Sequence, residues 1–293
     1  TYKADLSIGE LDGFLPFQVN LHDVALASKD STTQDTVVTV SQISSSIDVW
    51  GLLQNQVSIT GFTVDRPRLW LHSNAEGRMM MLDRRIKAAT SSGSAASERW
   101  FSQVEVVAPD VVVTNGAVFV TSATSNNTIA NLPPQFSLQS INANIFVDWS
   151  GQQRYLDIES LTAEPQNLKT RQIKLSGQLY SDQRYLEFNS LYLTLDDSEL
   201  TINGEIDGAN IMEPNVIQQM LAAEYNLSIN SDQLFVDDFG DLFPNAPEVD
   251  TPLAVEFQAE GNTDSLFVDR AILEMGESVL NVNGVLRDLQ NTK

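Results

Sequence analysis

Carboxylates are the most numerous side chains in this sequence that could do chemistry. Asp237, Asp238 and Asp241 lie close together along the chain and could offer oxygen ligands to a calcium ion. Their spacing does not match an EF-hand loop, so we interpret the group as part of an acidic helix and loop. The adjacent Asp196 and Asp197 are better explained as a turn, because 39 acidic residues must include neighbours by chance. We therefore predict no metal site.

Few other residues are available for catalysis. The chain has no cysteine, which excludes disulfides, thiolate metal sites and cysteine nucleophiles. Its two histidines, His22 and His72, are too few for the usual histidine zinc sites or Ser-His-Asp machinery, and we interpret both as strand residues. The sequence contains no phosphate-binding loop, dinucleotide fingerprint, nucleophile elbow or H-E-x-x-H motif. We predict that the protein is not an enzyme and needs no cofactor.

The charge of the chain bears on its partners. The 293 residues include 17 Lys and Arg against 39 Asp and Glu, which gives a formal net charge of −22. Nucleic acids are bound mainly through Lys and Arg, so we predict no nucleic-acid partner. The same charge disfavours electrostatic docking on an anionic membrane. Hydrophobic residues make up 42% of the chain, enough to bury a large surface.

The element that must position any functional residue is the β-strand. Apolar and polar residues alternate through most of the chain, as in Ile141, Ala143, Ile145 and Val147, with Phe146 as the one apolar residue on the polar face. Such alternation gives each strand one apolar and one polar face. Short polar turns separate the strands, and no helices are regularly interposed. The sequence therefore predicts a mainly β fold of antiparallel strands.

Helices are expected to be few and short. The sequence predicts one at residues 79–89, one after Pro214, and one at 236–243. We divide the chain into an N-terminal β module with a short helix, residues 1–95, and a repeating β segment, residues 96–293.

An internal repeat supports this division. Residues 186–208 align without gaps on residues 266–288. A shorter pattern, in which two alternating apolar residues precede a glycine, recurs along the chain, and we place its glycines at strand ends. These glycines are Gly61, Gly177, Gly204 and Gly284. Units that cannot bury their apolar face alone must stack, which predicts an elongated assembly.

A sheet with one apolar face along most of the chain is expected to have that face covered, because removing apolar surface from water stabilises by roughly 25 cal/mol per Å². Either a second sheet covers the face, or the sheet curls and holds an apolar ligand. The repeat favours a curled sheet with an open apolar groove. The residues predicted to line its inner face are Val57, Ile59, Ile145, Val147, Ile173, Leu175, Leu191, Leu193, Leu195, Leu200, Ile202, Leu273, Leu280 and Val282.

The N-terminal sequence resembles a known family. Residues 5–28, DLSIGELDGFLPFQVNLHDVALAS, followed by residues 37–71, resemble the opening module of the TamB/AsmA-like family, with matching pieces at 21–26, 47–53 and 57–69. Residues 104–120, which contain Asn115-Gly116, resemble the next strand pair of that family. Residues 237–244 and the strand after them resemble its middle repeats.

The resemblance implies a periplasmic protein anchored to the inner membrane by an N-terminal segment that this sequence lacks. It implies a curled β-sheet whose groove binds phospholipid acyl chains and carries phospholipid between the inner and outer membranes. It also implies a BamA-like outer-membrane protein as partner, through a region outside this sequence, and support for outer-membrane protein assembly. The alternative that the residues leave open is a secreted β-sandwich adhesin or structural binding module without lipid.

Overall fold

The computed structural model describes residues 4–14, 18–28, 36–47, 59–73, 79–80, 106–122, 133, 135–149, 153–182, 184–209, 219, 222–241, 249 and 251–287. Within these residues it contains seventeen strands, all in one sheet. The strands are β1 (Ala4–Ser7), β2 (Glu10–Asp12), β3 (Gln18–Ser28), β4 (Thr36–Ile47), β5 (Ile59–Asp65), β6 (Arg68–Ser73), β7 (Met79–Met80), β8 (Val106–Ser122), β9 (Gln135–Trp149), β10 (Arg154–Gln166), β11 (Ile173–Ser181), β12 (Tyr185–Leu195), β13 (Ser198–Asp207), β14 (Glu224–Leu234), β15 (Leu253–Gly261), β16 (Ser265–Met275) and β17 (Ser278–Arg287).

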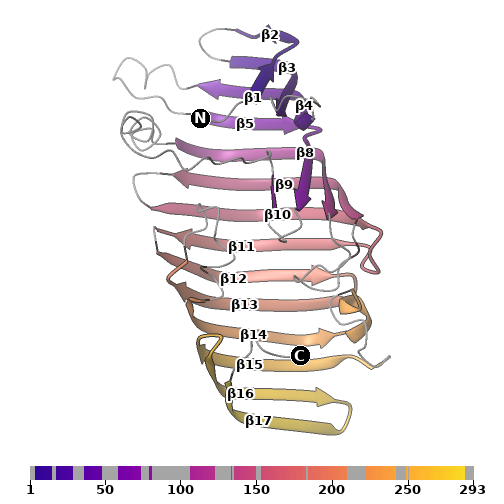
Figure 1. The fold of residues 1–293 in the computed structure, drawn as a ribbon, viewed down its shortest axis with the longest axis vertical. Helices are drawn as coiled ribbons and strands as arrows, with labels where there is room; N and C mark the ends of the chain where they lie inside the picture. The colour runs from indigo at the N-terminus through magenta and orange to yellow at the C-terminus, as the bar shows by residue number, and fades with distance from the viewer. Residues whose placement is uncertain are drawn as a thin grey trace.

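The sheet is elongated because each strand pairs mainly with its neighbours in sequence. β1 and β2 both pair with β3, which pairs with β4, and β4 pairs with β5 and β6. From β8 to β17 each strand is antiparallel to the next. Figure 1 shows the strands stacked along the long axis of the molecule, from the indigo N-terminal strands to the yellow β17. The predicted elongated, curled β-sheet is confirmed.

The antiparallel prediction is wrong for two pairs, since β5 and β6 both run parallel to β8. The two short strands lie end to end beside β8 and are separated by a break at Arg66 and Pro67. Arg66 has a φ of +50°, and proline has no N–H for the ladder. Asp65 accepts hydrogen bonds from the Nε of Arg66 (2.9 Å) and from Thr114 (2.9 Å), which together hold the pKa of Asp65 below its usual value.

A line of irregular residues crosses the C-terminal half of the sheet. The strand register shifts at Glu159 in β10, at Ser190 in β12 and at Asp269 in β16. Gly177 in β11 and Gly204 in β13 lie along the same line, because they pair with residues beside these shifts. Bulges and glycine kinks bend strands and increase their twist. This line, which we call the crease, therefore accounts for the curl of the sheet.

The repeated glycines lie inside strands, so their predicted place at strand ends is wrong. Gly177 has a φ of +128°, and a Cβ there would lie 2.6 Å from the carbonyl oxygen of Ser190. A Cβ on Gly204 would lie 2.6 Å from the carbonyl oxygen of Asn226. Only glycine allows such close backbone approach. The residue before Gly204, Asn203, accepts a hydrogen bond from the backbone N–H of Ser190 in the bulge (2.7 Å).

The Asn115-Gly116 sequence is also a bulge, and the strand pair expected at residues 104–120 is one continuous strand, β8. Asn115 has a φ of +52°, and its backbone N–H donates to the side chain of Asn142 in β9. β8 pairs with strands on both sides over its length, with β5 and β6 on one side and β9 on the other. These pairings hold the chain extended through a sequence that elsewhere would turn.

The repeat copies fold as matching hairpins. β12 and β13 contain the first copy, and β16 and β17 contain the second. Leu193 pairs with Leu200 as Leu273 pairs with Leu280, and both hairpins have a bulge opposite an Asn-Gly pair. The turn of the first copy contains Asp196-Asp197, as predicted. The predicted boundary at residue 95 lies outside the described residues.

Helical structure is sparse in the described part of the chain. Residues Met79–Met80 form strand β7 and not the start of a helix, and residues 81–89 lie outside the described residues. Of the helix predicted after Pro214, the structure describes Gln219 and Ala222, both helical. The helix predicted at 236–243 is a 3-10 helix, η1 (Val236–Phe239).

Candidate functional site

A row of apolar side chains crosses most of the sheet. It takes one residue from each strand from β2 to β13, apart from β6 and β7, and each residue lies directly opposite the next. Directly opposed residues of paired strands project from the same face of a sheet. The row runs through Leu11, Leu21, Ile43, Val64, Val113, Ala143, Leu161, Leu175, Leu193 and Leu200.

A second row beside it continues to the C-terminal edge. It passes through the paired residues Leu191, Ile202, Ile229, Phe257, Ala271 and Val282, one from each strand from β12 to β17. Neither row contains a charged or polar residue. Together they form an apolar face that follows the long axis of the molecule.

The bulges keep this face continuous. In β12 the apolar face contains Leu186 and Phe188 before the bulge and Leu191 and Leu193 after it. Strict alternation would put Leu191 on the opposite face from Phe188. The extra residue at the bulge returns Leu191 to the face that Phe188 shares. The same shift occurs in β10 and β16. The curl and the continuity of the apolar face therefore have one structural origin.

Most of the predicted lining residues share this face. Val57 lies outside the described residues, and Ile59 is described through its backbone pairing with Ile47. The residues that the structure places on the apolar face are Ile145, Val147, Ile173, Leu175, Leu191, Leu193, Leu195, Leu200, Ile202, Leu273, Leu280 and Val282. Their role in binding lipid stays a prediction.

The apolar face is incompletely covered. Leu175, Leu191 and Leu193 are half-buried, whereas a leucine in a packed core is normally buried. Towards the C-terminal edge the exposed fraction rises, to 38% at Leu273 and 53% at Leu280. The face thus retains apolar surface that a ligand could cover.

Several residues of the face were not among the predicted lining residues. Leu161, Ile229 and Phe257 lie in the rows described above, although no predicted lining residue came from β14 or β15. The sequence does contain a signal for Leu161. Two polar residues, Glu159 and Ser160, separate it from Ile158, which indicates that the alternation of apolar and polar residues shifts by one position there.

Comparison with known proteins identifies the family. The model of the AsmA family matches residues 3–258, which is most of the chain. The chain belongs to the AsmA family. No curated protein matches it.

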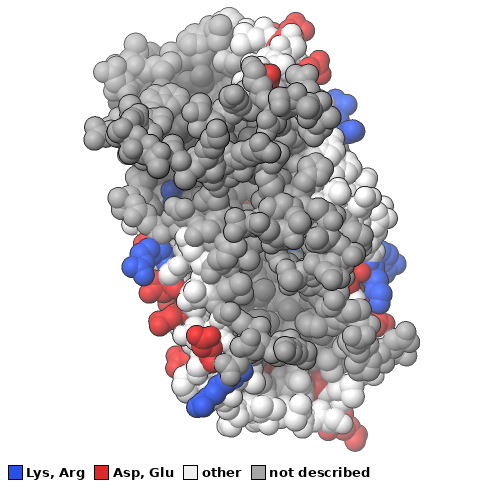
Figure 2. Space-filling model, in the orientation of Figure 1, with Lys and Arg blue, Asp and Glu red and all other residues white. Residues whose placement is uncertain are grey.

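AsmA-family proteins are membrane-associated proteins of the cell envelope. Within the described residues of this AsmA-family chain, no helix has the length and hydrophobicity to span a bilayer. Figure 2 shows charged side chains of described residues along both sides of the molecule.

The other face of the sheet carries carboxylates on its central strands. Glu187 lies directly opposite Glu205, and the hydroxyl of Tyr185 donates a hydrogen bond to Glu187 (3.4 Å). Phe146, the predicted apolar exception, lies on this face opposite Asp157. On β10, β12 and β13 the sheet of this AsmA-family chain therefore has carboxylates on the face opposite its apolar rows.

Tyr185 is expected to ionise late in an alkaline titration. Burial raises its pKa to about 12, and the charges of Glu187 and Glu205 contribute to the rise. A raised folded-state pKa means that the neutral phenol stabilises the fold below about pH 10 and that this contribution is lost as the pH rises towards 12. Phenolate absorbance should show a step near pH 12 that Tyr185→Phe removes. A step of the same size in the variant would contradict the assignment.

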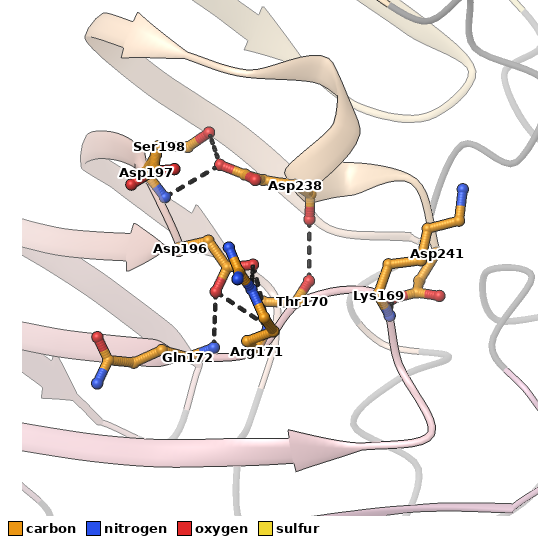
Figure 3. A network of polar contacts seen from close by, with 9 residues as sticks. All are labelled: Lys169, Thr170, Arg171, Gln172, Asp196, Asp197, Ser198, Asp238 and Asp241. Atoms are coloured by element: carbon orange, nitrogen blue, oxygen red, sulfur yellow. Dashed lines mark hydrogen bonds and ion pairs between the residues drawn. The ribbon is translucent and has the colours of Figure 1, made fainter.

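A short segment crosses the strand ends beside the apolar face. Residues 235–241, which contain η1 and which we call the strap, follow β14 and return towards β10 (Figure 3). The backbone N–H of Phe235 donates to the hydroxyl of Ser198 (2.8 Å), which donates to the carboxylate of Asp238 (2.6 Å). Ser198 is fully buried at the start of β13. These bonds fix the strap over the end of β13.

The other end of the strap is held by the loop between β10 and β11. Thr170 donates to the carbonyl oxygen of Asp238 (2.9 Å), and the backbone N–H of Lys169 donates to the carboxylate of Asp241 (2.6 Å) (Figure 3). A Cβ on Gly240 would lie 2.8 Å from the side chain of Lys169. The strap therefore spans the ends of β10 to β14.

The acidic residues here have structural roles. Asp196, in the turn between β12 and β13, accepts hydrogen bonds from the backbone N–H groups of Arg171 (3.0 Å) and Gln172 (2.8 Å). Asp238 and Asp241 hold the strap as described. Within the described part of the chain, no group of three or more metal-ligating side chains is placed to hold an ion.

Proposed function

We propose that this chain is part of a lipid conduit, in which the apolar face holds phospholipid acyl chains as lipid moves between the inner and outer membranes. The observation that carries the proposal is the unbroken apolar row through Leu11, Leu175 and Leu200, which runs from β2 to β13 without a charged residue. Membership of a membrane-associated envelope family supports lipid as the ligand.

Elementary energetics favour such a path. Covering a half-exposed apolar side chain gains roughly 25 cal/mol per Å². Because the row offers a similar apolar surface on each successive strand, an acyl chain gains about as much at one strand as at the next. Lipid can then shift along the row without a large change in free energy. Charged head groups stay in water, because burying an unpaired charge is costly.

In this proposal the protein acts without catalysis in the periplasm, held at the inner membrane by an N-terminal segment. A BamA-like outer-membrane protein would be its partner, and support of outer-membrane protein assembly would follow from lipid supply. The family resemblance supports this location and partner.

The described strands give no support to the alternative of a β-sandwich adhesin. A sandwich needs two sheets packed face to face, whereas the described strands belong to one sheet.

Site-specific photo-cross-linking tests the proposal. A cross-linker at Leu193, on the apolar face, is expected to capture labelled phospholipid from vesicles roughly tenfold more than one at Tyr192, on the polar face. Organic extraction of the purified protein should yield phospholipid by mass spectrometry. Equal capture from the two neighbouring positions would show that lipid does not follow the apolar face.

A further inference from the structure

On one side of the crease, part of the apolar face is already covered by the protein itself. Leu186 and Ile206 are 4% and 3% exposed, and they pack with Ala209 and Ala223 in a small core. Ala209 lies just after β13 and Ala223 just before β14, so these two residues cover part of the face there. Phe188 packs against the same core.

The strap bounds the apolar face on the opposite side. Ser198, which the strap covers, lies directly opposite Leu195, and Leu195 lies opposite Ile173. This row is therefore the last one before the strap and its polar contacts.

Between these boundaries lies a strip that we call the lane. On β13 the lane runs from Ser198, at the strap, to Gly204. The side chain of Leu227 fills the space beside Gly204, since a Cβ on Gly204 would lie 2.5 Å from it. These limits are about 20 Å apart along an extended strand. The lane contains two rows of half-buried or buried side chains. These are Leu175, Leu193 and Leu200 in one row and Leu191, Ile202 and Ile229 in the other.

We infer that the lane takes the two acyl chains of one lipid, one chain over each row, so that two-chain lipids pass along this part of the sheet in single file. The inference rests on the proposed function and narrows its ligand. The two rows run across the strands, so the chains lie along the long axis of the molecule. At β13 only Leu200 and Ile202 lie between the buried Ser198 at the strap and Gly204, so no third apolar row crosses this strand for further chains.

Cross-linkers on the two sides of the crease test the position of the lane. Leu191 and Ile229 lie in the lane, whereas Leu179 and Tyr225 lie on the same face but pack against the core. With vesicles that contain labelled two-chain phosphatidylcholine, capture from the lane positions should exceed capture from the core positions roughly tenfold. All four positions are half-buried, and urea midpoints of the variants confirm that each still folds.

A lipid with four acyl chains tests whether the lane has room for more than two chains. Vesicles with labelled cardiolipin should give roughly tenfold less capture at Leu191 than vesicles with phosphatidylcholine, because two of its chains find no row. Equal capture of the two lipids, or equal capture from lane and core positions, would overturn the lane while leaving the conduit. Capture of neither lipid from Leu191, or cross-links from Leu191 to protein alone, would overturn both.

Discussion

Replacement of Leu193 by aspartate is expected to reduce phospholipid transfer between vesicles roughly tenfold or more. Leu193 lies in the middle of the apolar row, between Leu175 and Leu200. A carboxylate there faces acyl chains with no described cation directly opposite. An unpaired charge in an apolar environment costs several kcal/mol. In the proposed conduit lipid crosses every strand in turn, so one such position raises the barrier for the whole path.

Two variants separate this effect from a loss of stability. Thr201→Asp places the same charge on the polar face, opposite the uncharged Tyr192 and Asn230, and should transfer lipid like the unmodified protein. Leu193→Ala removes volume but adds no charge and should retain most transfer. Transfer is measured with a fluorescent phospholipid, and urea midpoints check the fold. Transfer by Leu193→Asp at the level of Thr201→Asp would rule out the row as the path.

Alternation alone predicted the mainly β fold class correctly and indicated which residues of a strand share a face, for a physical reason. Side chains on a strand point to opposite faces in turn, so Leu191, Leu193 and Leu195 must share a face wherever the strand lies. The same logic placed Phe146 on the polar face. The repeat was visible because its two hairpins need leucines and an Asn-Gly pair at equivalent positions.

Features that depend on distant pairing could not be predicted in this way. Whether Asn115-Gly116 turns or bulges is decided by the strands on both sides of β8, which local sequence does not encode. The parallel pairing of β5 with β8 depends on the path of the chain between them. Leu161 joins the face only because a bulge shifts the alternation in β10, and the cost of the bulge is offset by the neighbouring strands.

The crease is the feature whose disruption should most affect stability. Gly177→Ala is expected to lower the free energy of unfolding by about 3 kcal/mol. The φ of +128° at Gly177 lies in a region that is essentially restricted to glycine. The new Cβ would also lie 2.6 Å from the carbonyl oxygen of Ser190 and 2.7 Å from the Cα of Leu191, both backbone atoms of β12 that cannot rotate away. The two strands must separate, and the hydrogen bonds between them weaken.

Gly61→Ala is the matched control, because a Cβ on Gly61 meets no atom within 4 Å. Its urea midpoint should stay close to that of the unmodified protein, and removal of backbone freedom from the unfolded chain gives a small gain of about 0.5 kcal/mol. Gly177→Ala should unfold at clearly lower urea and lose amide protection in β11 and β12 first. If the two alanine variants unfold at the same urea concentration, backbone approach at the crease does not hold the curl. The bend of the sheet would then have to come from side-chain packing on the apolar face.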